Sequence, residues 1–249
     1  MNRALNFGRA VEEYEHGRPG WPVEVVDRAA ERLHVDPSAT VLDLGAGTGK
    51  LTRLLASRFA KVIAVEPDPA MRALLGQVTD CHLVLEGSAE AIPLPDASVD
   101  AVFVGDAFHW FANPWAVGEI ARVLRSGGGL AVLRMWWESS PELPAALKSE
   151  LDALTSSANT EWSWGPDYAT GEWLDLFRLG DFEEPRVEQL VREIDVDADR
   201  LASLWLSVSS VAMQPSARRE ALATCLRSGL AGAYRLKLTI DLYCAQPAK

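Results

Sequence analysis

Three glycines at alternate positions could bring the backbone close to a ligand. Gly45, Gly47 and Gly49 follow directly on an apolar segment at residues 40–44. Glycine lets a chain turn sharply and approach a ligand closely, because no Cβ intervenes. A nucleotide-like cofactor that lies across the carboxyl end of a strand requires that geometry. We expect a cofactor-binding loop here, although a tight strand-to-helix turn without a ligand would carry the same glycines.

Two acidic residues stand at the ends of neighbouring apolar segments. Asp43 precedes the first glycine by two positions, and Glu66 follows a second apolar segment at residues 61–65. A carboxylate accepts two hydrogen bonds, so an acid at the end of the second strand of a βαβ unit can hold both ribose hydroxyls. Alone, Glu66 would be a solvated residue at a strand end, but its register with the glycines favours ribose binding.

A helix is expected to begin just after Glu66. Asp68 can cap it, and Pro69 suits its first turn. Pro67 is expected to lie beside the cofactor. Met71 can lie along the adenine or ribose, or it can pack in the core as a methionine at a helix start commonly does.

Apolar segments and amphipathic segments alternate through the first half of the chain, which predicts a parallel sheet covered by helices on both faces. We expect strands at residues 40–44, 62–65, 82–86, 100–104 and 130–133, and helices at residues 22–33, 50–57, 70–75 and 114–124. The later part predicts a helix at 141–153, a loop at 161–166, and strands at 186–194 and 235–244. Asp197 and Ser216 can each cap a helix, which would run to about residue 208 and about residue 226 respectively.

Composition limits the class of protein. A net charge of −11 over 249 residues gives no basic surface for phosphates, so we expect no nucleic-acid partner. We expect neither a signal peptide nor a membrane span, because no apolar stretch approaches about 18 residues. The three cysteines are odd in number and widely spaced, and the four histidines lack metal-ligand spacing. These features predict a cytoplasmic protein with reduced thiols and no metal site.

The glycine loop with Asp43, Ala46 and Glu66 resembles the signature of class I S-adenosylmethionine-dependent methyltransferases. Residues 87–90, 105–111 and 122–129 extend the resemblance, with Ser126 where the family usually has proline. It implies an α/β fold with a doubly wound, mostly parallel seven-stranded sheet and an antiparallel last strand. It also implies that S-adenosylmethionine is the cofactor and that these loop residues contact it. Residues 138–180 show no strand pattern, which predicts a helical insertion after strand five.

The same resemblance assigns roles to two later loops. Small residues after the third strand bring backbone groups to the adenine edge, and Ser88, Ala89 and Glu90 occupy that place. A plain turn with Ser88 as a helix cap is the alternative. Asp106 and His109 follow the fourth strand, where the methyl end of the cofactor should lie. His109 is the candidate general base, because imidazole titrates near neutral pH, but it can equally bond to backbone and pack beside its neighbour.

The N-terminal segment narrows the resemblance to a small-molecule group that includes trans-aconitate methyltransferases. Tyr14, Arg18 and Trp21 match its Tyr-x-x-x-Arg-Pro-x-aromatic-Pro pattern. The resemblance implies that residues 1–22 form a lid over the cofactor, with Arg18 paired to the methionine carboxylate and Tyr14 lining the sulfonium. Alternatively, Arg18 is a surface charge that fixes a proline-rich turn.

Four consecutive segments follow from these assignments: residues 1–35 as lid and first helix, 36–135 as cofactor core, 136–184 as helical insertion and substrate cap, and 185–249 as closing helices and strands.

Seven of the nine tryptophans lie between residues 110 and 173, where they can hold a planar acceptor or pack the insertion. The expected activity is methyl transfer to oxygen, nitrogen or carbon of a small molecule. The alternatives are a non-catalytic S-adenosylmethionine-binding regulator or scaffold and a nicotinamide-dependent oxidoreductase, whose G-x-G-x-x-G spacing is absent from the loop.

Overall fold

The computed structural model describes residues 10–138, 143–161 and 172–248. Its contacts divide the chain into two compact units, each built from three stretches. Unit 1 comprises Met1–Pro19, Trp136–Ser163 and Val191–Thr239, and unit 2 comprises Gly20–Met135, Trp164–Leu190 and Ile240–Lys249. The four consecutive segments expected from the sequence stay a prediction.

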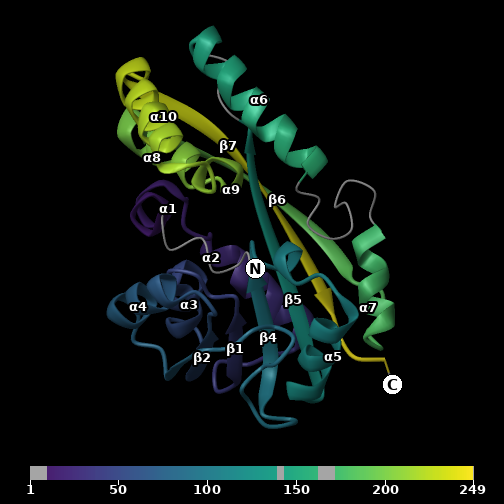
Figure 1. The fold of residues 1–249 in the computed structure, drawn as a ribbon. Helices are drawn as coiled ribbons and strands as arrows, with labels where there is room; N and C mark the ends of the chain where they lie inside the picture. The colour runs from purple at the N-terminus through teal and green to yellow at the C-terminus, as the bar shows by residue number, and fades with distance from the viewer. Residues whose placement is uncertain (1–9, 139–142, 162–171, 249) are drawn as a thin grey trace. The chain divides into compact units, whose positions relative to one another are not determined.

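A seven-stranded sheet runs through the fold in the order β3-β2-β1-β4-β5-β7-β6 (Figure 1). The strands are β1 (Thr40–Leu44), β2 (Lys61–Val65), β3 (Leu83–Leu85), β4 (Val99–Gly105), β5 (Leu124–Glu138), β6 (Arg186–Asp197) and β7 (Ala233–Ala245). The predicted α/β class with a mostly parallel seven-stranded sheet is therefore confirmed.

The five strands of the first half pair in parallel. Leu42 lies opposite Ile63 of β2 and Val102 of β4, and Val102 lies opposite Leu130 of β5. Leu42, Val102 and Leu130 are each fully buried. Parallel strands are covered on both faces, which explains their nearly continuous apolar sequences. Because these strands share a direction, their carboxyl ends and the loops that follow lie at one edge of the sheet.

The last strand runs opposite to its neighbour β6. Gln189 Nε2 donates to Asp241 Oδ1 at 2.8 Å, and Arg235 Nε donates to Asp195 Oδ1 at 2.9 Å. Residue numbers fall along β7 as they rise along β6, so the two strands are antiparallel, as the resemblance implied for the last strand.

The described helices are α1 (Val11–Gly17), α2 (Val23–Leu33), α3 (Lys50–Ala56), α4 (Pro69–Val78), α5 (Pro114–Val123), α6 (Ala145–Glu161), α7 (Asp175–Leu179), α8 (Ala198–Leu206), α9 (Ser209–Ala212) and α10 (Ser216–Gly229). Asp68 caps α4 by accepting from Ala70 N and Met71 N, and Asp197 caps α8, as predicted. In α10 the capping position is Pro215 and Ser216 is the first helical residue, so that predicted cap was wrong by one position. None of the described helices is long and apolar enough to cross a bilayer.

Two expected boundaries differ from the structure. The fifth strand begins at Leu124 and not at residue 130. Its pairing with β4 shifts between Val99↔Leu124 and Ala101↔Gly129, so the glycine run forms an irregular bulge inside the strand. The helix expected at residues 141–153 begins at Ala145 and continues to Glu161. The loop expected at 161–166 lies almost wholly outside the described residues.

Candidate active site

The glycine loop connects β1 to α3 in unit 2 and is tied to the neighbouring strand. Gly45 N and Ala46 N both donate to the Val65 carbonyl, at 2.9 and 3.1 Å. The three glycines adopt positive φ angles of 72°, 58° and 87°, a region that side chains with a Cβ rarely occupy. The loop is therefore held by main-chain bonds in a conformation that only glycine adopts readily.

Only one of the three glycines faces open space. A Cβ on Gly45 would lie 2.8 Å from Ala107 Cβ, and one on Gly49 would lie 2.6 Å from Leu75 Cδ1. A Cβ on Gly47 would meet no heavy atom of the described residues within 4 Å. Gly45 and Gly49 thus permit close packing inside the protein, whereas Gly47 is where a ligand can approach the backbone.

Glu66 joins this loop to the turn after β2. Its side chain is 6% exposed, with Oε2 accepting from Gly47 N and Oε1 accepting from Asp68 N, each at 2.8 Å. A carboxylate has about four lone-pair positions, so each oxygen retains one for a further donor such as a ribose hydroxyl. Burial raises the pKa of Glu66 to about 7, although the two backbone bonds favour the ionised form. The sequence did not reveal this structural role of Glu66.

Arg72 fixes the turn that carries Glu66. Its Nη1 donates to the carbonyls of Glu66 and Pro67 at 2.8 and 3.0 Å, and its Nη2 donates to Glu86 Oε2 at 2.7 Å. Met71 is 3% exposed, which places it in the core, and its suggested contact with the cofactor stays a prediction.

Asp43 places a second buried carboxylate beside the loop. It is 1% exposed, and Oδ2 accepts from the Thr52 hydroxyl at 2.6 Å. Its Oδ1 is buried without a hydrogen-bond partner among the described residues. Burial raises the pKa of Asp43 to about 7, and the charge of Glu66 adds to the rise. A buried carboxylate oxygen in this state is suited to a positively charged or hydrogen-bonding ligand group.

The loop after β3 forms a tight turn. Ala91 N donates to the Ser88 carbonyl at 3.2 Å, and Ala89 is 4% exposed. Glu90 Oε1 accepts from Asn113 Nδ2 at 3.0 Å, which links the turn to the start of α5. This part of the described chain is not helical, so the alternative role of Ser88 as a helix cap was wrong.

The loop after β4 is fixed at both ends. Asp106 adopts a positive φ of 49°, its N–H donates to the Leu133 carbonyl at 2.9 Å, and its Oδ1 accepts from Met135 N at 2.7 Å. Phe108 is buried against Phe177, with ring centroids 6.1 Å apart. Asp106 therefore has a structural role in holding β5 to β4.

His109 follows in a short 3₁₀ turn, Phe108–Trp110. Its ring is half-buried, and its centroid lies 5.1 Å from that of Trp110. It packs beside Trp110 as the alternative interpretation has it, and its role as a base stays a prediction.

Trp21 forms part of the site region in unit 2. A Cβ on Gly105, the last residue of β4, would lie 3.2 Å from Trp21 Cζ2 and 3.0 Å from Leu51 Cδ2. The indole therefore lies against the carboxyl end of β4 and the first turn of α3. The sequence singled out Trp21 for a lid but gave no sign of this packing partner.

Tyr14 and Arg18 belong to unit 1, and their contacts lie within that unit. Arg18 Nε donates to Ser207 Oγ at 3.0 Å, and its Cζ lies 4.7 Å from the Trp137 ring centroid and 5.4 Å from that of Tyr14. These are cation–π distances. Arg18 is thus held by side chains from β5 and from Ser207, which directly follows α8, and not by its own turn alone.

The tryptophans that suggested an aromatic surface are divided between the units. Trp136 and Trp137 belong to unit 1, Trp110, Trp115 and Trp173 belong to unit 2, and Trp162 and Trp164 lie outside the described residues. Trp173 is 1% exposed and packs in the core, whereas Trp115 is 78% exposed. In the part of the chain that the structure describes, no cluster of His, Cys, Asp or Glu could hold a metal ion.

Comparison with known proteins agrees with this geometry. The profile of the family described as "Methyltransferase domain" matches residues 42–132. An uncharacterised methyltransferase of Mycobacterium tuberculosis is 46% identical over 143 residues, which cover 56% of this chain and 54% of the relative. An uncharacterised methyltransferase-like protein of Schizosaccharomyces pombe is 32% identical over 218 residues, covering 86% of this chain and 81% of that protein.

A solved structure shows the same fold. It is a candidate type II methyltransferase of Anaeromyxobacter dehalogenans, with a TM-score of 0.63, 23% identity, and coverage of 91% of this chain and 97% of that chain. The chain spans about half the length of the mycobacterial relative and most of the fission-yeast protein. The sheet, the glycine loop and these matches place the chain in the methyltransferase family.

Proposed function

We propose that the chain is a cytoplasmic enzyme that transfers a methyl group from S-adenosylmethionine to a small molecule. The observation that carries the proposal is the arrangement around Gly47. This glycine faces open space, its N–H is held by Glu66, and the buried Oδ1 of Asp43 is without a partner among the described residues. A nucleoside with a cationic amino-acid tail would supply donors to both carboxylates.

The residues of unit 2 fit such a cofactor. Glu66 has one unused lone-pair position on each oxygen for the ribose hydroxyls, and Asp43 suits the ammonium group or a donor beside it. The turn at Ser88 and Ala89 would meet the adenine edge. In unit 1, Tyr14 and Arg18 would contact the methionine end, a role that rests on the resemblance to the trans-aconitate group.

The cofactor would supply an electrophilic methyl group when bound. The chain then has to hold the acceptor in line with that group and to exclude water from it. Trp21 and the loop after β4, with His109, line the edge of the sheet where this must occur. The net charge of −11 supports a small-molecule acceptor over a nucleic acid.

A general base is required only where the acceptor keeps its proton at neutral pH. His109 is the candidate for that task, and its half-buried position beside Trp110 supports a positioning role equally well. We favour an acceptor that is already ionised, for which alignment alone suffices.

Ligand-dependent melting tests the proposal. A ligand that binds only the native state stabilises it by about 2.7 kcal/mol at 100 times its dissociation constant. S-adenosylmethionine and S-adenosylhomocysteine should raise the melting temperature, whereas NAD should not. Transfer of label from [methyl-³H]S-adenosylmethionine to an acceptor panel then separates an enzyme from a regulator that only binds. Stabilisation by NAD alone would overturn the proposal in favour of an oxidoreductase.

A further inference from the structure

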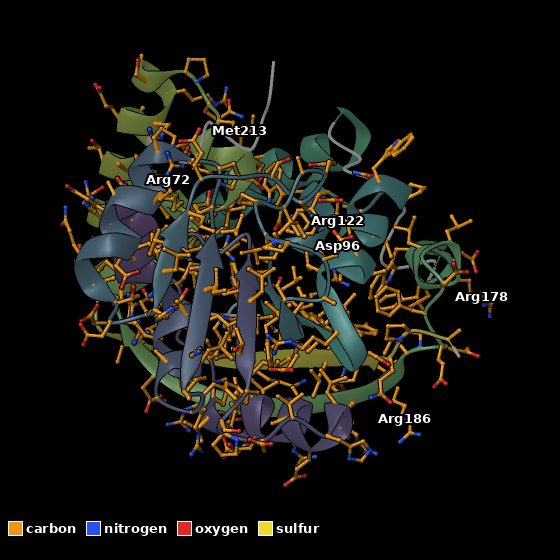
Figure 2. The ribbon with its side chains drawn as sticks, turned by 90° about the horizontal axis from the view of Figure 1, so that it is seen from below. Arg72, Asp96, Arg122, Arg178, Arg186 and Met213 are labelled. Atoms are coloured by element: carbon orange, nitrogen blue, oxygen red, sulfur yellow. The ribbon has the colours of Figure 1, made fainter. Side chains whose placement is uncertain are left out.

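Arg122, near the end of α5, donates hydrogen bonds from all three nitrogens of its guanidinium group. Nε and Nη2 donate to the two oxygens of Glu119 at 2.7 and 2.8 Å, and Nη1 donates to Asp96 Oδ1 at 2.7 Å (Figure 2). Two further bonds reach main-chain carbonyls, at 2.9 Å to Leu94 and 3.0 Å to Ile92. Five donors therefore meet five acceptors, which is the full capacity of an arginine side chain.

Glu119 completes the arrangement from the same helix. Its Oε2 also accepts from Ile92 N at 2.9 Å, so Ile92 is bonded through both its N–H and its carbonyl. The main chain continues the link, because Ala97 N donates to the Arg122 carbonyl at 2.9 Å. Residues 92–97 are thus fixed to α5 along their length.

These residues directly support the turn at Ser88. Ala91, whose N–H bonds to the Ser88 carbonyl, immediately precedes Ile92. A Cβ on Gly87 would lie 2.6 Å from Pro93 Cδ, so Pro93 packs closely on the main chain of Gly87. A shift of residues 92–94 would therefore displace residues 87–89, because Pro93 is already in close contact with Gly87.

An ordinary surface ion pair would not require this geometry. The Asp96 side chain is 80% exposed, and exposed pairs contribute little to stability. Lysine could supply such a pair, but it has only three donors and no planar fork. The bonds from Arg122 to the carbonyls of Ile92 and Leu94 instead fix the main chain of residues 92–94.

We propose that Arg122, oriented by Glu119, is a positioning residue for the adenine side of the cofactor site. It acts through residues 92–94 on the backbone at Ser88 and Ala89. The inference rests on the proposed function, and it extends that function to a residue that would not touch the cofactor.

The test is the affinity of S-adenosylhomocysteine and of 5′-methylthioadenosine for Arg122→Lys and Arg122→Met, measured by titration calorimetry. Residues that act on a site without touching its ligand change affinity by about threefold to thirtyfold. We expect a weakening in that range for both variants, by the same factor for both ligands, because the methionine end is unaffected. Amide hydrogen exchange at residues 88–97 should also accelerate.

Two control variants separate positioning from general stability. Arg125→Met removes an ion pair with Asp100 just beyond the same helix, at 2.7 Å, without touching residues 92–96. Ile120→Val removes a buried methyl group from α5 itself. Both should keep parental affinity for the two ligands, and Glu119→Gln should weaken binding less than Arg122→Met, because it keeps an acceptor for Ile92 N.

The outcomes distinguish the two levels of the proposal. If the parent binds neither ligand, the proposed function fails. If the parent binds both ligands and the Arg122 variants bind them with the same affinity as the parent, only the role of Arg122 is overturned. It is also overturned if Ile120→Val weakens binding as much as Arg122→Met does.

Discussion

The loops of unit 2 and the N-terminal segment of unit 1 hold their charged groups in different ways. In unit 2, Glu66 accepts from Gly47 N, 19 residues away, and Asp43 accepts from Thr52, nine residues away. In unit 1, Arg18 reaches Ser207 across 189 residues and lies over the Trp137 ring. The carboxylates of unit 2 bond to groups close to them in the sequence, whereas Arg18 is held by side chains from distant segments.

This difference indicates which substitutions would disturb the main chain of the candidate site. Loss of the Glu66 carboxylate would leave backbone N–H groups of two loops without their acceptor, whereas loss of the Arg18 guanidinium would remove hydrogen bonds to Ser207 and two ring contacts. The matched family region, residues 42–132, lies entirely within unit 2. The proposed cofactor loops therefore lie in the matched region, whereas Tyr14 and Arg18 lie outside it.

The largest expected effect concerns Asp43. Its folded pKa of about 7 lies above the ordinary value of 3.8, so the folded state binds more protons between these pH values. Stability should fall as pH rises through this window, by up to about 4 kcal/mol from this group, and the loss should be complete above pH 7. Asp43→Asn should remove that part of the fall while weakening S-adenosylhomocysteine binding at least tenfold.

Urea unfolding of both proteins at pH 4, 6 and 8 measures this effect. Asn keeps an oxygen acceptor for the Thr52 hydroxyl, so the variant should fold. An identical pH dependence in parent and variant would show that Asp43 is not the titrating group.

Glu66→Ala should have the next largest effect. It leaves the N–H groups of Gly47 and Asp68 without their acceptor, which costs about 1–3 kcal/mol for each group that stays buried. Affinity for S-adenosylhomocysteine should fall at least tenfold. The matched control is Asp27→Ala, which removes an exposed pair with Arg58 in the same unit. If Glu66→Ala and the control variant bind S-adenosylhomocysteine with equal affinity, the role of Glu66 is structural and it does not bind the cofactor.

Arg18→Ala tests the proposed role of unit 1 by comparing its affinity for two ligands, only one of which carries the methionine carboxylate. If Arg18 pairs with the methionine carboxylate, S-adenosylhomocysteine should bind about tenfold more weakly, in line with a lost charge-assisted bond. 5′-Methylthioadenosine lacks that carboxylate and should bind as it does to the parent. Equal weakening of both ligands would mean that Arg18 acts through the structure of unit 1. Slowed hydrogen exchange of the N-terminal peptide with bound ligand would support the proposed lid.

The smallest effect is expected at His109. If the acceptor is already ionised, His109→Gln should lower kcat by less than about threefold, because alignment provides the rate. A loss of about 10²–10⁴ in kcat, with unchanged cofactor affinity, would instead identify His109 as the base and prove our preference wrong.

The features that the sequence predicted correctly are local ones. The ends of β1 and β2, the glycine loop and the Asp68 cap depend on residues close to one another in the chain, so their spacing is informative. The fifth strand was predicted too short because its bulge depends on pairing with β4, which spacing does not report. The partners of Arg18 lie on β5 and after α8, and only the tertiary fold brings them together.

The bond between Thr52 and Asp43 is predictable from helix register. Thr52 lies in the first turn of the helix after the glycines, where a hydroxyl can reach the strand-end carboxylate of Asp43. The double role of Glu66 could not have been predicted, because it depends on two backbone N–H groups whose directions are set by positive φ at Gly47 and by the turn at Asp68.

The most direct test of the cofactor site is a two-dimensional ¹⁵N–¹H NMR spectrum of glycine-labelled protein during titration with S-adenosylhomocysteine. Gly47 borders the proposed ligand and donates to Glu66, so its amide resonance should shift most, with smaller shifts at Gly45 and Gly49. Gly129, which pairs with Ala101 at the other end of the parallel strands, serves as the internal reference. NAD at the same concentration should leave the Gly47 resonance unchanged. A Gly47 resonance that does not respond to S-adenosylhomocysteine, or that responds to NAD, would contradict our assignment of the cofactor site.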